Sequence, residues 1–214
     1  MNYLPEGCLD MNPTTEINKK NKFTLWSFLY ADLLRQEKLL KNKNKNKNKN
    51  DKFAIIKFFV RAFSPRFIPN FLCRLAHSMY LVRIYPLAKL FSTLNFLFFG
   101  IEISIRCPIG KGLYLPHTHG TVIGAWEIGE NVTIFQGVTL GAKELDFSYR
   151  KSFRPIIQDG VVVGAGAKIL GGVNIGERSI VGANAVVLID VPSDCFALGI
   201  PARIKNKSMA SNSI

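Results

Sequence analysis

Three features are scarce in this 214-residue sequence: paired cysteines, acidic residues in the first half, and long uninterrupted apolar runs. The four cysteines, Cys8, Cys73, Cys107 and Cys195, lie far apart and form no CxxC pair. That spacing is typical neither of a disulfide framework nor of a zinc site. We therefore expect reduced thiols, a cytoplasmic protein and no bound metal.

Long apolar runs are absent as well. The first 20 residues are polar and hold no apolar segment of the kind a secretory signal needs. Cations interrupt the most apolar stretch, residues 53–105, so that no run reaches the ~18–20 residues of a membrane-spanning helix. We expect a protein that does not cross a membrane, and peripheral contact with the inner face of the cell membrane stays open.

Acidic residues are few in the first half of the chain. Residues 1–100 hold 17 Lys+Arg against 6 Asp+Glu, whereas residues 101–214 hold 11 against 9. Nucleic acid, an anionic membrane surface and a polyanionic substrate are the three partners that such a charge suits. No recognition motif accompanies the basic residues, so we expect no nucleic-acid partner.

The first half of the chain divides into four parts. Residues 1–23 are polar and are predicted to be disordered. Apolar residues recur at helical spacing over residues 24–40, and residues 52–99 predict two or three helices. Between them, residues 41–50 (KNKNKNKNKN) have nothing to bury and predict a solvated linker, with anion binding as its alternative. Together these parts give an α-helical region over 24–100.

Prolines and phenylalanines shape the expected helices of residues 52–99. We expect breaks near Pro65, Pro69 and Pro86, because proline interrupts helical hydrogen bonding. The phenylalanines of this stretch favour helix–helix packing, and their alternative role is a basic, aromatic surface for a membrane. They are Phe58, Phe59, Phe63, Phe67 and Phe71.

A period of six residues dominates the second half of the chain. One unbroken series holds Ile157, Val163, Ile169, Ile175, Val181 and Val187. An earlier series holds Ile128, Ile134 and Leu140, with Val122 one step before, and Ile109 and Leu115 form a shorter run. This period fits neither a helix nor a simple strand and is typical of a solenoid. It predicts three short strands per triangular coil, and therefore a left-handed parallel β-helix over residues 101–205, followed by a flexible tail, 206–214.

The repeat stops between Ala142 and Ile156. Insertions in a solenoid leave as loops on one face, often the functional one. We therefore expect a functional loop here.

These motifs resemble the serine O-acetyltransferase family of hexapeptide-repeat acyltransferases. The matching stretches are IGKGLYLPHTHGTVIG (109–124), VTIFQGVTLG (132–141), VVVGAGAKILGGVNIG (161–176) and VPSDCFALGIPARI (191–204). The resemblance implies that His117, in the sequence HTHG, is the general base. An imidazole of near-neutral pKa can take the proton of a hydroxyl as it attacks a thioester.

The resemblance also implies an acidic residue fifteen positions earlier that orients the base. Glu102 occupies that position, where the family has Asp. His119 is the rival to His117 as base, and we also assign it to the acceptor site. Aligned there too are Phe153 and Arg154, where the family has an Arg-His pair that reads the serine carboxylate.

Two departures from the family bear on the acceptor. Pro116 replaces the acidic residue that reads the serine ammonium, and Phe153 replaces a cation. We therefore expect a sugar hydroxyl of a capsular or other surface polysaccharide as acceptor, with L-serine as the alternative. A non-catalytic trimeric scaffold is the alternative of another class.

The resemblance implies acetyl-CoA as donor, bound in a groove between neighbouring β-helices, and hence a homotrimer. Small residues would let the pantetheine approach the backbone, and cations would meet the CoA phosphates. The small residues are Gly141, Ala142, Gly164 and Ala165, and the cations are Lys168, Arg203 and Lys205. A plain solvated surface is the alternative for each cation.

Overall fold

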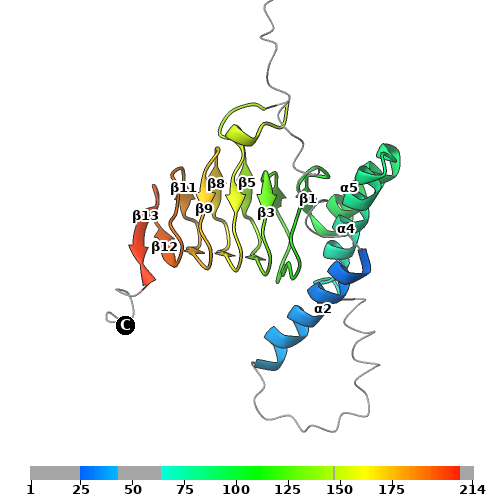
Figure 1. Cartoon of the computed structure of the whole chain (residues 1–214), viewed down its shortest axis with the longest axis horizontal. Helices are drawn as coiled ribbons and strands as arrows, with labels where there is room; N and C mark the ends of the chain where they lie inside the picture. The colour runs from blue at the N-terminus through cyan, green and yellow to red at the C-terminus, as the bar shows by residue number, and fades with distance from the viewer. Residues whose placement is uncertain (1–24, 43–63, 147, 208–214) are drawn as a thin grey trace, which may run out of the picture.

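The computed structural model describes residues 25–42, 64–146 and 148–207. Helices gather at one end of an elongated molecule and strands stack along the rest (Figure 1). The predictions for residues 1–23, for 43–50 of the linker, for Phe58, Phe59 and Phe63, and for the tail beyond residue 207 lie outside the described residues.

Three helices form the described part of the N-terminal region: α2 (Leu25–Asn42), α4 (Ile68–Leu81) and α5 (Tyr85–Phe99). Helix α2 runs two residues into the expected linker, because neither Lys41 nor Asn42 forces a helix to stop. The expected breaks near Pro69 and Pro86 are confirmed, because α4 begins at Ile68 after a turn and α5 begins at Tyr85 after α4 has ended at Leu81. Each proline lies in the first turn of the helix that follows the break. The missing N–H of a proline costs nothing there.

The second half of the chain is the predicted left-handed parallel β-helix, which the structure confirms. Its strands form three sheets, in the orders β1-β2-β5-β8-β11, β13-β12-β10-β7-β4 and β3-β6-β9. Each pair is parallel except β12 with β13. The strands are β1 (Ile101–Ile103), β2 (Thr121–Ile123), β3 (Glu127–Ile128), β4 (Thr133–Ile134), β5 (Thr139–Gly141), β6 (Ile156–Ile157), β7 (Val162–Val163), β8 (Lys168–Leu170), β9 (Asn174–Ile175), β10 (Ile180–Val181), β11 (Val186–Val187), β12 (Cys195–Leu198) and β13 (Arg203–Asn206).

The apolar residues of the six-residue series fill the interior of the coil. Each member from Ile157 to Val187 is at most 1% exposed. The prediction for Val122 is wrong, because its side chain is 37% exposed and its neighbour Ile123 is the buried one. Ile103 pairs with Ile123 and Ile109 pairs with Ile128, so the unit from Ile123 to Ile128 is one residue shorter than the regular six and the inward position moves by one residue.

Polar side chains from the helices bind the first coil of the β-helix. Asp32 of α2 and Arg74 of α4 form a buried ion pair at 3.2 Å. The Asp32 carboxylate also accepts from the backbone N–H groups of Gly112 (2.8 Å) and Leu113 (3.0 Å). Arg74 donates onward to the carbonyls of Ile109 and Gly110. The helical region is thus attached to the β-helix through backbone groups that the first coil leaves free.

The interruption of the repeat leaves the β-helix as a loop, as expected (Figure 1). It connects β5 to β6 and contains a 3₁₀ turn at Lys151–Phe153. At the far end of the molecule β13 pairs antiparallel with β12, from Cys195↔Asn206 to Leu198↔Arg203. Asn206, predicted to begin the tail, is therefore the last residue of a strand. Within the described ranges, no helix is long and apolar enough to span a membrane.

Candidate functional site

The turn that carries His117 is longer than the other turns at the same corner of the coil. Tyr114 pairs with Thr133, and Val122 pairs with Thr139 in the next coil. Tyr114 and Val122 are therefore eight positions apart in one coil, whereas Thr133 and Thr139 are six positions apart in the next coil. The two additional residues make the HTHG turn project beyond a regular corner, and the imidazole of His117 is exposed on it.

The end of helix α5 supports this turn. The Thr118 hydroxyl donates to the carbonyl of Phe99 at 2.8 Å, and the Gly120 N–H donates to the carbonyl of Gly100 at 2.9 Å. Gly100 ends α5 with a φ of +60°, and a Cβ there would lie 2.6 Å from Nδ1 of His119. His119 therefore lies against the helix end, while His117 does not share this contact.

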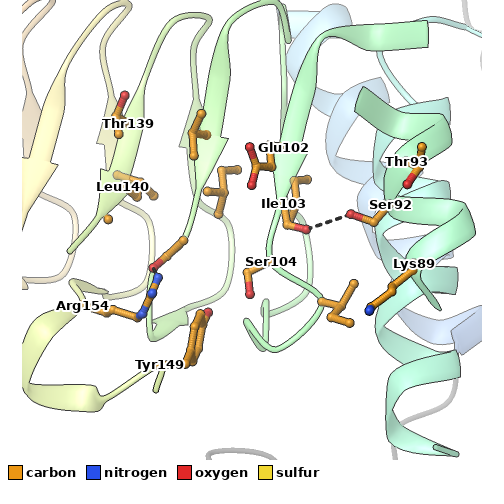
Figure 2. A pocket seen from close by; sticks show the side chains of 15 residues that line it. Lys89, Ser92, Thr93, Glu102, Ile103, Ser104, Thr139, Leu140, Tyr149 and Arg154 are labelled. Carbon is orange, nitrogen blue, oxygen red and sulfur yellow. Dashed lines mark hydrogen bonds between the residues drawn. The ribbon is translucent and has the colours of Figure 1, made fainter. Parts of the chain in front are cut away.

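A pocket of about 490 Å³ lies between helix α5, strands β1, β2 and β5, and the loop (Figure 2). Glu102 projects into it from β1, Lys89 and Thr93 approach from α5, and Tyr149 and Arg154 approach from the loop. His117 is not among the residues that line it. Among the described residues, Glu102 has no hydrogen bond or ion pair, and both it and His117 are exposed. The single chain therefore does not join the expected base to its orienting residue.

Arg154 is held in place by the loop and by the β-helix together. Its Nε donates to Asp146 at 3.0 Å, Nη1 to the carbonyl of Gly124 at 2.8 Å and Nη2 to the carbonyl of Asp146 at 3.1 Å. Gly124 is needed for this approach, because a Cβ there would lie 2.9 Å from Nη1. A guanidinium has five N–H groups, so one on each terminal nitrogen remains for a ligand.

Asp146 and Tyr149 fix the loop against the corner of the coil. Desolvation favours the neutral acid, but hydrogen bonds from the Arg150 N–H and the Arg154 guanidinium outweigh it and lower the pKa of Asp146. Burial raises the pKa of Tyr149, whose phenol donates to the carbonyl of Ala125 at 2.6 Å. The Arg154 guanidinium lies 4.0 Å from the centre of the Tyr149 ring. The loop thus presents Arg154 from a fixed position.

Phe153 lies next to Arg154 but is not a free aromatic platform. The guanidinium of Arg150 lies 3.9 Å from the centre of its ring and covers one face. The stacking surface that we expected for a sugar is therefore partly occupied within the loop itself.

The seven residues expected to bind CoA do not share one environment. A Cβ at Gly141 would meet nothing within 4 Å, so an approaching ligand has room there. A Cβ at Gly164 would lie 2.6 Å from the backbone nitrogen of Ala183, so this glycine serves the stacking of the coils. Ala142 and Ala165 are half-buried near these two glycines in sequence.

The three cations expected to bind the CoA phosphates lie in two different sheets. Lys168 lies in β8 beside β5, and its ammonium donates to the carbonyl of Gly137 at 2.5 Å. Arg203 and Lys205 are exposed on β13, in the sheet that contains β12 and not in the sheet of Gly141. In one chain, therefore, Lys168 lies with Gly141, and Arg203 and Lys205 lie apart from them.

Known proteins share both the repeat and the fold. Residues 154–188 match the family model for the bacterial transferase hexapeptide (six repeats). The serine acetyltransferase of Helicobacter pylori strain J99 is 44% identical over 135 residues, which cover 63% of this chain and 77% of that protein. The apoenzyme structure of soybean serine acetyltransferase superposes with a TM-score of 0.70 at 31% identity, over 89% of this chain and 72% of the other. The chain belongs to the serine acetyltransferase family.

The chain spans less than two thirds of the length of several of the relatives that it matches. The protein from Bacillus subtilis strain 168 is 44% identical over 132 residues, which cover 61% of this chain and only 59% of that relative. A serine acetyltransferase solved in complex with CoA superposes with a TM-score of 0.69 at 27% identity, over 89% of this chain and 73% of the other.

Two kinds of residue at this site were not predicted from the sequence. Asp146 and Tyr149 fall in the insertion, whose polar and aromatic character was visible, but their partners at Gly124 and Ala125 were not. Thr118 lies between two histidines and bonds to a helix nineteen positions earlier, a contact that no local pattern indicates.

Proposed function

We propose that this chain is an O-acetyltransferase that transfers the acetyl group of acetyl-CoA to the hydroxyl of L-serine. The observation that carries the proposal is the presentation of His117 on a projecting turn within a serine acetyltransferase fold. The relatives support serine over the surface polysaccharide that Pro116 and Phe153 led us to expect. They carry the name serine acetyltransferase, and nothing in the comparisons supports a glycan acceptor.

The proposed chemistry is general-base catalysis. His117 takes the hydroxyl proton as the serine oxygen attacks the thioester carbonyl, so that a tetrahedral oxyanion forms. The intermediate collapses as the carbon–sulfur bond breaks, the thiolate of CoA takes the proton back, and O-acetylserine remains. The two N–H groups left on Arg154 suit the serine carboxylate. CoA would follow the open surface at Gly141 toward Lys168.

We further propose that the chain works as a homotrimer. His117 and Glu102 are both exposed and unjoined in one protomer, and Arg203 and Lys205 lie in a different sheet from Gly141. A groove between two β-helices would bring one chain's HTHG turn to another chain's surface.

A glycan acceptor remains the second candidate, since Pro116 removes the partner of the serine ammonium. The deciding experiment is release of CoA from acetyl-CoA by the purified protein, followed through its thiol. L-Serine, serinamide and a panel of surface oligosaccharides serve as acceptors. Turnover with serine and not with serinamide supports the carboxylate role of Arg154. Turnover with oligosaccharides alone would replace serine by a sugar, and no turnover with any acceptor would refute the enzymatic proposal.

Thr118 is expected to position His117 for this reaction. Thr118→Val keeps the shape of the side chain and removes the hydrogen bond to Phe99. The loss of one such bond corresponds to about threefold to tenfold in kcat. The KM for acetyl-CoA and the melting temperature should stay close to those of the wild type, and Thr118→Ser should restore kcat. A Thr118→Ser variant as slow as Thr118→Val would contradict the positioning role.

A further inference from the structure

Helix α5 exposes apolar residues on the side opposite its packed face. Ala88 and Asn95 are buried, and they mark the face that packs inward. On the opposite face, Pro86, Leu90, Thr93 and Leu97 recur at the spacing of one helix surface, and all four are exposed. Leu90 is 51% exposed and Leu97 is 67% exposed.

Further apolar residues are exposed at both ends of the helix. The turn before α5 exposes Val82, Ile84 and Tyr85, and its last turn exposes Phe96 and Phe98 in addition to Leu97. Phe98 is 74% exposed. We call the surface formed by residues 82–86, 90 and 96–98 the α5 face. Contiguous exposed surface of this kind marks a place of contact, since single exposed apolar residues are ordinary and grouped ones are not.

The charged residues within α5 and the turn before it are all cations. The sequence contains no Asp or Glu between Asp51 and Glu102. Arg66, Arg83 and Lys89 are exposed within the described part of that interval, and Glu102 of β1 lies across the pocket from Lys89. Apolar side chains with cations among them are the combination that inserts into the headgroup region of an anionic bilayer.

We propose that the α5 face is a docking surface for an anionic lipid bilayer, on which helix α5 lies parallel to the membrane. Charge separates this partner from a second copy of the chain, because the cations on the α5 faces of two copies would repel each other. The position of the helix also suits a flat partner. Helix α5 lies at the end of the elongated molecule opposite β13, where the stacked coils leave it accessible (Figure 1).

Flotation with lipid vesicles tests the proposal on the full-length protein. Vesicles of equal parts phosphatidylglycerol and phosphatidylcholine are compared with vesicles of phosphatidylcholine alone. We expect binding to the first and not to the second, with weakening as salt is raised. The Leu90→Asn/Leu97→Asn double variant should bind the anionic vesicles at least about tenfold more weakly than the wild type, because the two apolar side chains that insert are lost.

The matched control is Leu188→Asn/Ile189→Asn, which changes two exposed apolar residues near β11 and should bind vesicles as the wild type does. Both double variants keep every Lys and Arg of the chain. The electrostatic attraction to anionic vesicles is therefore the same for the wild type and the two variants. Equal vesicle binding by the Leu90→Asn/Leu97→Asn variant and the wild type would overturn the proposal. So would a smaller oligomer for that variant alone in sedimentation, since the α5 face would then be an interface between copies.

Discussion

Replacing His117 with alanine is expected to lower kcat for acetyl transfer by about 10²–10⁴-fold, the usual contribution of a general base. The projecting turn places the imidazole outside the packed coil, so its removal leaves no cavity and should leave folding intact. Binding of acetyl-CoA does not need the base, and its KM should change little. The measurement is steady-state release of CoA at saturating acetyl-CoA and serine.

His119→Ala is the matched control. His119 lies two residues along the same turn but against Gly100 at the end of α5. We expect a much smaller loss of kcat for this variant than for His117→Ala. A loss of about 10²–10⁴-fold in kcat for His119→Ala, together with a small loss for His117→Ala, would show that His119 is the general base and His117 is not.

Asp32→Ala is expected to cost about 3–5 kcal/mol of unfolding free energy, because it leaves the Arg74 guanidinium buried without its partner. The side chains of the pair are 0% and 3% exposed. Burial raises the pKa of Asp32 even though Arg74 and two backbone N–H groups favour its charged form. The variant also leaves the N–H groups of Gly112 and Leu113 without an acceptor. Urea unfolding followed by circular dichroism measures the loss.

An exposed pair of the same residue types provides the comparison. Arg178 and Asp194 form an ion pair at 2.6 Å, and both side chains are at least half exposed. Solvent screens such a pair, so Asp194→Ala should move the unfolding midpoint far less than Asp32→Ala. Similar midpoints for the two variants would show that the helices do not depend on Asp32 for their attachment.

The coil was predictable because its cause is local and repeated. Every sixth residue from Ile157 to Val187 faces a narrow interior, and the sequence displays that constraint directly. Val122 was misassigned because the unit from Ile123 to Ile128 has five residues in place of six, and a period gives no information where it is broken. The two additional residues of the HTHG turn are a separate irregularity of the same coil, and they present His117.

Contacts between distant segments were not predictable. Asp32 and Arg74 each occupy an ordinary helical position, and nothing in their own segments indicates that both reach the loop near Gly112. Arg154 was found by resemblance, but its attachment to Gly124 and Asp146 depends on how the insertion folds back.

Other elements of the chain cover part of each end of the coil, and this bears on how copies of the molecule can stack. A parallel solenoid presents hydrogen-bonding edges at its first and last coils, and such edges recruit further strands. Here the helices bind the carbonyls of the first coil, and the antiparallel β13 runs along β12 at the other end. β13 covers the edge of β12, and its antiparallel direction does not match the parallel strands of another copy's first coil. Parallel head-to-tail stacking is therefore disfavoured in this sheet, and a chain truncated before Arg203, which exposes the edge of β12, should stack more readily.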